Sequence, residues 1–463
     1  MTAQEYDAIV IGSGQAGTPL SVALAKSGMR TALIERQHVG GTCINEGCTP
    51  TKTMVASGRV AYLVRRAADY GVHTGPVSID MVKVRQRKRD IVDRFRNGSQ
   101  SPIEKTPNLD LIFGEARFIA PRTANVTRQD GSHLEISAKR VFINCGTRAS
   151  RPNLDGLDGV SFLDNRSIME LDHVPDHLLV LGGGYIGLEF GQLFRRLGSR
   201  VTIVQSANQL LTREDPDVAE EVTNIIRQDG VEVVLSARAV RVIQTGPSIQ
   251  LEVQSPGGST TLAGSHLLVA TGRVPNSDTL NLTATQVQMD RHGFIQVNDR
   301  LETTADGIYA LGDIKGGPAF THIAYDDFRI IRANLIEKKN ASIKDRQVPY
   351  AVFIDPQLGR IGLSETEARA QSRKVRVAKL PMTHVARALE VDETRGFIKT
   401  VVDAETHQIL GAAVLGIEGG EVMSVLQVAM MGKLPYTALR DATLAHPTLA
   451  ESLNNLFMAL DSA

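Results

Sequence analysis

The sequence is poor in three features that would point to a particular environment: cysteine, net charge and long apolar runs. Its 463 residues include only three cysteines, too few for the disulfide framework of a secreted protein. Lys plus Arg and Asp plus Glu number 51 each, so no long-range field favours nucleic acid or an anionic membrane. No run approaches the roughly 18 apolar residues of a membrane span, and the opening MTAQEYDAIVIG lacks a secretory signal pattern. A cytoplasmic protein is expected.

The composition that remains is that of an ordinary globular protein. Hydrophobic residues make up 42% of the chain and charged residues 22%. A prior of about 150 residues per domain suggests about three domains. From about residue 346 the pattern changes to short strands separated by turns, followed by helix from about residue 421. The third domain is therefore expected to be of mixed α and β character.

One pattern occurs twice in the sequence: a strand, a tight glycine turn, a helix and a second strand. Glycines at GxGxxG spacing let the backbone approach a pyrophosphate, which rests against the helix N-terminus. In both copies the residue that ends the second strand lies 23 positions after the first glycine. The chain is expected to bind two dinucleotides. The predicted binding residues are Gly12, Gly14, Gly17 and Glu35 in residues 6–35, and Gly182, Gly184, Gly187 and Gln205 in residues 178–205.

The two residues that end these second strands bear on which dinucleotide each copy binds. Glu35 offers a carboxylate to a ribose diol and would repel a 2′-phosphate, which suits FAD or NAD. Gln205 can bond a ribose hydroxyl without repelling a phosphate, but the sequence around it, QSANQ, supplies no arginine to hold one. NADH and NADPH both stay open, with a slight preference for NADPH.

Two further residues fall at the ends of apolar strands. Asp313, in IYALGDI, follows a strand at the position where open parallel sheets place ligands, although a turn acid or helix cap is an equally good interpretation. Cys145, in VFINCG, lies within a strand pattern and is expected to be a small buried hydrophobe.

The other two cysteines, Cys43 and Cys48, lie in GGTCINEGCTPTK, residues 40–52, here named the cysteine segment. Structural zinc would need two further ligands, and only His38 is close in sequence. A disulfide between residues five apart requires an irregular backbone, which Gly47 and Pro50 favour. So short a loop gains little stability from a crosslink, a few kcal/mol at most. Switching between dithiol and disulfide is therefore the better explanation.

At this point the motifs resemble a known family. The cysteine segment, together with ATGRVPN, YALGD and LAHPTLAESL, resembles the class I pyridine nucleotide-disulfide oxidoreductases, which include glutathione reductase, dihydrolipoamide dehydrogenase and mercuric reductase. The motifs are most similar to mercuric reductase-like members without a C-terminal cysteine pair. The resemblance implies an α/β fold with two Rossmann-like dinucleotide-binding domains and a C-terminal α+β dimerisation domain. It implies a homodimer in which residues 1–150 and 272–345 bind FAD, residues 151–271 bind NAD(P)H, and residues 346–463 dimerise.

The resemblance also implies roles for individual residues. Cys48 would be the sulfur nearer the flavin and Cys43 the one that exchanges with substrate. His446, acting in the partner subunit's site, would be the base that Glu451 orients. Lys52 and Glu189 would pair beside the flavin, and Tyr185 would cover the nicotinamide pocket. The remaining cofactor-binding residues implied are Gly41, Thr42, Ala116, Thr147, Gly272, Arg273 and Asp313.

Several acceptors and functions stay open on the sequence alone. An oxidised sulfur compound such as a disulfide is favoured, because His446 can protonate a leaving thiolate. Mercuric ion is an alternative, since thiolates bind soft metals, although the chain ends NNLFMALDSA without cysteines. Dihydrolipoamide dehydrogenase activity is a further alternative, as is electron transfer from flavin to oxygen or quinones. The non-enzymatic alternative is a nucleotide-dependent redox sensor.

Overall fold

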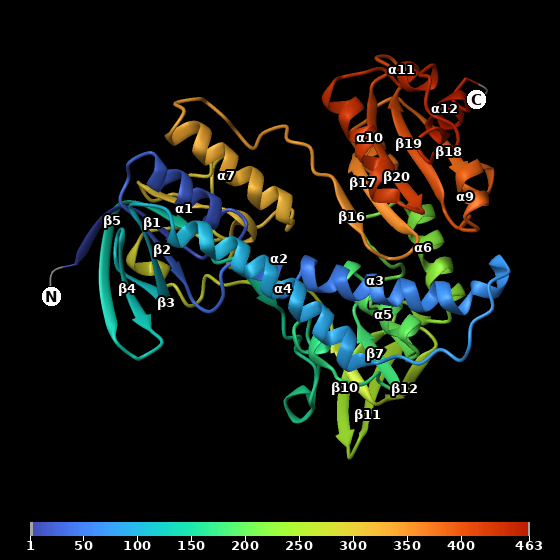
Figure 1. Cartoon of the computed structure of the whole chain (residues 1–463), viewed down its shortest axis with the longest axis horizontal. Helices are drawn as coiled ribbons and strands as arrows, with labels where there is room; N and C mark the ends of the chain where they lie inside the picture. Colours follow the sequence, from blue (N-terminus) through green and yellow to red (C-terminus); the bar gives the residue numbers. More distant parts are fainter. Residues whose placement is uncertain (1–2, 462–463) are drawn as a thin grey trace. The chain divides into compact units, whose positions relative to one another are not determined.

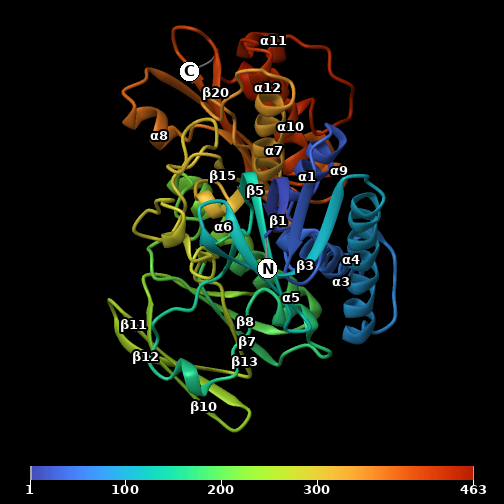
Figure 2. The ribbon, with the colours of Figure 1, turned by 90° about the vertical axis from the view of Figure 1, so that its left-hand side faces the viewer.

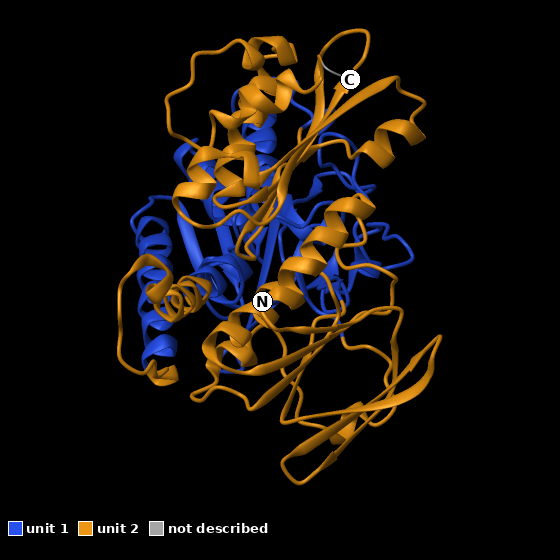
Figure 3. Ribbon diagram, turned by 90° about the vertical axis from the view of Figure 1, so that its right-hand side faces the viewer, with its two compact units in different colours: residues 1–53, 83–150, 272–346 blue, residues 54–82, 151–271, 347–463 orange. Residues whose placement is uncertain are grey.

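The computed structural model describes residues 3–461 of the chain. These residues form two compact units, which are coloured separately in Figure 3. The first unit comprises residues up to 53 together with 83–150 and 272–346, and the second comprises 54–82, 151–271 and 347 onward. No described helix is both long enough and apolar enough to cross a membrane.

The first unit is built on a six-stranded sheet (Figure 1). Strand β1 pairs in parallel with β2 and β5, β15 pairs in parallel with β5, and β3, β4 and β5 form an antiparallel run. The strands are β1 (Gln4–Ile11), β2 (Thr31–Glu35), β3 (Leu109–Ala120), β4 (Thr123–Arg128), β5 (His133–Ile143) and β15 (Ile308–Ala310).

Strand β1 reads as a continuous apolar run because both of its faces are covered. Ala8 and Val10 pack in one core with residues of the helices α1 (Gly17–Lys26) and α7 (Thr321–Leu335). Ile9 and Ile11 face a second core formed with the antiparallel strands. Burial on both faces is typical of parallel strands that have helices or further strands on each side. The first unit also contains α2 (Gly41–Asn45) and most of α4 (Met81–Glu104).

The second unit contains a four-stranded parallel sheet in the order β13-β7-β8-β9. Helices α5 (Tyr185–Leu197) and α6 (Pro216–Gln228) connect its strands, and a three-stranded antiparallel sheet, β10-β11-β12, follows β9 (Figure 2). The strands are β7 (His177–Leu181), β8 (Arg200–Val204), β9 (Glu232–Val234), β13 (His266–Val269), β10 (Arg238–Thr245), β11 (Ser248–Ser255) and β12 (Gly258–Gly264).

The C-terminal part of the second unit is an antiparallel sheet with helices, in the order β16-β17-β20-β19-β18. Helices α10 (Gly419–Met431) and α12 (Ser452–Met458) supply Leu426, Leu453 and Phe457 to its core. The α/β class with a C-terminal α+β part is thereby confirmed. The strands are β16 (Tyr350–Val352), β17 (Gln357–Gly362), β18 (Val375–Pro381), β19 (Phe397–Asp403) and β20 (Ile409–Gly416).

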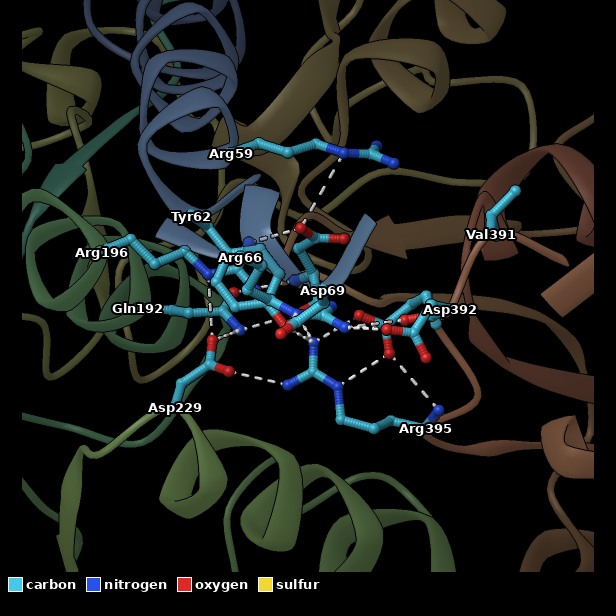
Figure 4. Close-up of polar contacts among 12 residues, drawn as sticks. Arg59, Tyr62, Arg66, Asp69, Gln192, Arg196, Asp229, Val391, Asp392 and Arg395 are labelled. Atoms are coloured by element: carbon cyan, nitrogen blue, oxygen red, sulfur yellow. Dashed lines mark hydrogen bonds and ion pairs between the residues drawn. The ribbon is translucent and has the colours of Figure 1, made fainter. Parts of the chain in front are cut away.

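A buried network of charged side chains joins α5 to the segment that follows β16 (Figure 4). Arg196 donates through Nε to Asp229 at 3.0 Å, and its Nη1 atom bonds the carboxylate of Asp355. All three side chains are at most 11% exposed. The guanidinium of Arg196 also lies 3.9 Å from the ring centroid of Tyr62, and Arg395 pairs with Asp229 at 2.7 Å. Each buried charge in this network therefore has an opposite partner, as burial in a low dielectric requires.

Candidate active site

The cysteine segment is irregular at one point, between its two thiols. Helix α2 ends at Asn45, and Cys48 is the first residue of α3 (Cys48–Arg65). A Cβ atom on Gly47 would lie 2.9 Å from the carbonyl oxygen of Thr42, so the chain turns here through a position that only glycine fits easily. The break that the sequence predicts near Gly47 is therefore present, and it separates the two helices that carry the cysteines.

Cys43 and Cys48 are in the dithiol form, and their side chains interact. The hydrogen bond with Cys48 and burial both raise the pKa of Cys43, and a negative charge on Cys48 raises it further. A hydrogen bond from Thr321 and the charge of Lys52 act in the opposite direction. The pair can therefore hold one thiolate far more readily than two, which is the usual behaviour of adjacent ionisable groups.

Thr321 is a site residue that the sequence did not reveal. Its Oγ1 atom lies 3.5 Å from the Sγ of Cys48, although the two residues are 273 positions apart. Thr321 is also the first residue of the 15-residue helix α7, whose N-terminal dipole favours negative charge nearby. A hydroxyl and a helix N-terminus thus lie at the sulfur that begins α3. No local motif around THIAYDD could have indicated this contact.

The two glycine turns have the same close packing. A Cβ atom on Gly17 would lie 2.0 Å from the oxygen of Gly12, and one on Gly187 would lie 2.0 Å from the oxygen of Gly182. Within the described chain, neither α1 nor α5 has a side-chain hydrogen bond at its N-cap. The first-turn N–H groups of both helices can therefore bind an anion such as a pyrophosphate. Both turns fit the dinucleotides that the spacing predicts.

Glu35, the last residue of β2, and Gln205, the residue that follows β8, make similar hydrogen bonds. Glu35 accepts a hydrogen bond from the backbone N–H of Ser13 at 3.1 Å, and Gln205 accepts one from that of Gly183 at 3.0 Å. Each side chain therefore lies against its own glycine turn, as a ribose-binding residue would. Gln205 does this without a charge. The local geometry agrees with the sequence, and it leaves the choice between NADH and NADPH open.

The cysteine segment begins directly against the first glycine turn. A Cβ atom on Gly41 would lie 2.7 Å from the Cα of Gly14, so the two backbones touch. Thr42 follows at once and leads into Cys43. The structure therefore brings together, within the first unit, the predicted pyrophosphate turn and the two cysteines of the cysteine segment. This is the placement that a cofactor spanning both features would need.

Asp313 lies just after β15, within the short 3-10 helix Gly312–Lys315. Its carboxylate accepts a hydrogen bond from Thr147 at 3.3 Å, and Arg273 donates to the same threonine at 2.8 Å. Burial raises the pKa of Asp313, and the charge of Arg273 opposes that shift. Gly272, next to Arg273, has a positive φ of 124°. Asp313, Thr147 and Arg273 are thus brought into one polar cluster.

Three other predicted site residues lie in α5 or in β3. Glu189 is 3% exposed, and its Oε1 accepts a hydrogen bond from the backbone N–H of Phe353 at 2.9 Å. Tyr185, the first residue of α5, is 38% exposed. Ala116 is buried in β3, opposite Val126. Lys52 belongs to the first unit and Glu189 to the second, so the pairing of these two residues stays a prediction.

His446 and Glu451 are in contact, as the family resemblance implies. The Nδ1 atom of His446 lies 2.9 Å from Glu451 Oε2, and the imidazole is 67% exposed. This contact fixes the ring so that Nε2 points away from the carboxylate and is accessible. Cys145 is not part of this chemistry: burial raises its pKa to about 12. Among the described residues, no group of His, Cys, Asp and Glu side chains forms a metal site.

Comparison with known proteins identifies the family. Residues 6–327 match the family described as pyridine nucleotide-disulphide oxidoreductase, and residues 348–457 match the dimerisation domain of the same name. The chain therefore belongs to the pyridine nucleotide-disulfide oxidoreductases. It is an oxidoreductase of the kind that uses FAD and NAD(P)H, and the recognition made from the motifs is confirmed.

Individual relatives cover nearly the whole chain. It is 38% identical to the probable pyridine nucleotide-disulfide oxidoreductase RclA of Escherichia coli, over 98% of this chain and 99% of that one. A solved structure described as the Cu(II) complex of HOCl-induced flavoprotein disulfide reductase RclA matches with a TM-score of 0.90 over the same shares. A mercuric reductase of Bacillus cereus is 35% identical over 99% of this chain and 72% of its own length. A dihydrolipoyl dehydrogenase of Bacillus subtilis is 31% identical over 97% of both chains.

Proposed function

We propose that the protein is a homodimeric reductase that uses NAD(P)H to reduce a small oxidised sulfur compound through the pair Cys43 and Cys48. The observation that carries the proposal is the interacting dithiol, which adjoins the first glycine turn and has Thr321 at one sulfur. In this proposal the first glycine turn, Glu35, Thr42, Thr147, Arg273 and Asp313 hold FAD, in a domain of residues 1–150 and 272–345. The second glycine turn, Tyr185 and Gln205 hold NAD(P)H within residues 151–271.

Bound FAD would supply the two-electron relay between NAD(P)H and the sulfur pair. Two electrons and two protons convert the Cys43–Cys48 disulfide into the dithiol. Lys52 would supply a positive charge beside the flavin. Cys43 would give its proton to His446 of the partner subunit, attack one sulfur of the acceptor as thiolate and break its S–S bond. Cys48 attacks Cys43 in the mixed disulfide, releases the second thiol product and restores the disulfide.

The leaving thiolate of the acceptor needs a proton at this step. His446 of the partner subunit would donate it from Nε2, with Glu451 holding the opposite ring nitrogen. Residues 346–463 would form the dimer that brings this histidine to the other chain's cysteines. The overall balance is one disulfide, one NAD(P)H and one proton giving two thiols and NAD(P)⁺.

The test is a pair of substitutions, Cys43→Ser and Cys48→Ser, in the purified flavoprotein. Both variants should lose turnover of disulfide acceptors while NAD(P)H still reduces an artificial dye, because dye reduction does not need the sulfur pair. A stopped-flow comparison of NADH and NADPH on the same variants reports the preferred coenzyme. Full disulfide turnover by either variant would refute the proposal, and the redox-sensor alternative predicts no disulfide turnover in the unsubstituted protein.

Mercuric ion is a second candidate acceptor, because the cysteine segment binds soft metals in principle and mercuric reductases are among the relatives. The exposed pair of His446 and Glu451 favours the sulfur acceptor instead, since a metal ion needs no proton donor. NADPH oxidation with mercuric ion, measured beside a disulfide under the same conditions, separates the two. A larger kcat/KM for mercuric ion would reverse the preference.

A further inference from the structure

Helix α4 is strongly basic in a chain that has no net charge. Between residues 83 and 96 it carries seven basic side chains and two acidic ones, a net charge of +5. The basic residues are Lys83, Arg85, Arg87, Lys88, Arg89, Arg94 and Arg96. All lie in the first unit, which also holds both redox cysteines. So concentrated a charge of one sign creates a local potential even when the whole molecule is neutral.

Two of these arginines bind the cysteine segment and the residue after it. Arg96 donates through Nε to Asn45 Oδ1 at 2.9 Å, and Asn45 lies two positions after Cys43. Arg87 donates through Nη1 to the carbonyl oxygen of Thr53 at 2.7 Å, five positions after Cys48. Helix α4 therefore lies along the stretch that carries both thiols.

Asn45, which accepts the hydrogen bond from Arg96, also bonds the backbone that leads into Cys43. Its Nδ2 atom donates to the carbonyl oxygen of Gly41 at 2.9 Å and to that of Val39 at 3.1 Å. Because one amide side chain joins Arg96 to both carbonyls, the helix and the cysteine segment are held together in a fixed arrangement. The charge on α4 is thus kept close to the thiols.

Part of this positive charge is not neutralised by carboxylates. Within residues 3–461 no ion pair involves Arg87 or Arg94, and both side chains are exposed. These two residues are seven positions apart, so they lie on the same side of the helix. An exposed cation without a carboxylate partner adds fully to the local potential, whereas a paired one contributes little at a distance.

We propose that α4 selects anionic acceptors, namely oxidised sulfur compounds that carry carboxylate or sulfonate groups, by attracting them to Cys43. This proposal rests on the proposed function. Attraction by a fixed positive field raises the rate of encounter and weakens as salt screens it, with a Debye length of about 10 Å at 0.1 M ionic strength. The charge of α4 should leave the encounter rate of neutral acceptors unchanged and lower that of cationic acceptors.

The field can be measured without turnover, on the single thiol of Cys43. Iodoacetate and iodoacetamide alkylate the same thiolate, but only iodoacetate is charged. The ratio of their rates at Cys43 in the Cys48→Ser variant therefore cancels any change in the pKa of Cys43. Replacing Arg87 and Arg94 together by glutamine should lower this ratio roughly threefold to tenfold at low salt. Salt at 0.5 M should remove most of the difference.

Two matched controls identify the cause. The double substitution of Arg87 and Arg94 by lysine keeps the charge and should leave the ratio near that of the parent protein. Arg238→Gln removes one exposed charge from β10 in the second unit and should leave it unchanged. An unchanged ratio in the double glutamine variant would overturn the proposal. Equal losses in the lysine and glutamine variants would overturn it too, because they would indicate a structural role.

Turnover then links the field to the acceptor. The dianionic disulfide of 5-thio-2-nitrobenzoate, neutral hydroxyethyl disulfide and dicationic cystamine provide three charges. In the double glutamine variant, kcat/KM should fall for the dianionic disulfide and stay the same for hydroxyethyl disulfide. It should rise for cystamine. If the unsubstituted protein turned over none of the three disulfides, the proposed function would be refuted. The alkylation ratio could still be interpreted, because it does not depend on turnover. Tight, salt-sensitive binding of a DNA duplex with no change in the ratio would instead make α4 a nucleic-acid surface and overturn the proposal.

Discussion

The Oγ1 atom of Thr321 lies 3.5 Å from the Sγ of Cys48, and Thr321 also lowers the pKa of Cys43. One hydroxyl therefore interacts with both sulfurs. Because a hydroxyl can donate or accept, it can donate to whichever sulfur carries the negative charge. This makes Thr321 a determinant of which protonation state the reduced pair adopts.

Replacing Thr321 by valine removes the hydroxyl and keeps the shape of the side chain. The pKa of Cys43 should rise further, because one of the influences that lower it is lost. With about 1 kcal/mol for the hydrogen bond, alkylation of Cys43 by iodoacetamide at neutral pH should slow roughly fivefold. Thr321→Ser keeps the donor and should behave like the parent protein. The same rate in the valine variant would show that the contact has no energetic effect.

Glu451→Gln tests the orientation of His446. The amide can still occupy the position 2.9 Å from Nδ1, but it no longer stabilises a charged imidazole. Turnover of a disulfide acceptor should fall by about 10-fold to 100-fold, less than the roughly 10²- to 10⁴-fold loss expected of His446→Ala. Reduction of bound flavin by NAD(P)H, followed anaerobically, should be unchanged in both. Equal turnover in Glu451→Gln and the parent protein would remove Glu451 from the site.

Gln205→Glu tests the choice of coenzyme. Either side chain can accept the N–H of Gly183, so the turn should stay intact. The new carboxylate would repel a 2′-phosphate and bond a ribose diol. The KM for NADPH should rise roughly tenfold or more while that for NADH stays level or falls, as measured by steady-state kinetics with one fixed acceptor. An equal change for both coenzymes would mean that Gln205 does not face the ribose.

Arg196→Met tests the buried network of the second unit. It leaves the carboxylates of Asp229 and Asp355 without this partner in a site where Arg196 is only 5% exposed. A loss of about 3–5 kcal/mol is expected, visible as a lower midpoint of urea unfolding. The exposed pair of Arg241 and Asp155 is the control, since Arg241→Gln should cost less than about 1 kcal/mol. Similar losses in both variants would contradict the distinction.

Asp215 should make stability depend on acid. Burial alone would raise its pKa, but hydrogen bonds from Thr366 and the backbone N–H of Glu365, with the ion pair to Lys399, outweigh it and lower the pKa to about 2. The carboxylate therefore adds about 2 kcal/mol above pH 4, and this contribution is lost as the pH falls from about 4 to about 2. Asp215→Asn should be less stable at pH 7, and the gap should close in acid. A gap that persists at pH 2 would contradict this assignment.

The sequence predicted those features that depend on neighbouring residues. The glycine turns and the helix break at Gly47 follow from spacings of a few positions, and both are present. The contact between His446 and Glu451, which the family resemblance implies, is present as well. The fold class and family followed from the order of such motifs. Contacts that join distant parts of the chain were not predictable, because no local pattern encodes them. Thr321 at Cys48 and the N–H of Phe353 at Glu189 are two of these.

Three residues of helix α5 bond the segment 353–355. Glu189, Gln192 and Arg196, along one side of α5, bond Phe353 and Asp355 through backbone as well as side-chain atoms. An insertion or deletion of a single residue here would put all of these contacts out of register together. Within the described residues, the hairpin turn between β10 and β11, at residues 246–247, makes no comparable set of hydrogen bonds to a helix. Natural variation in chain length should therefore accumulate at that turn and be nearly absent between residues 353 and 355.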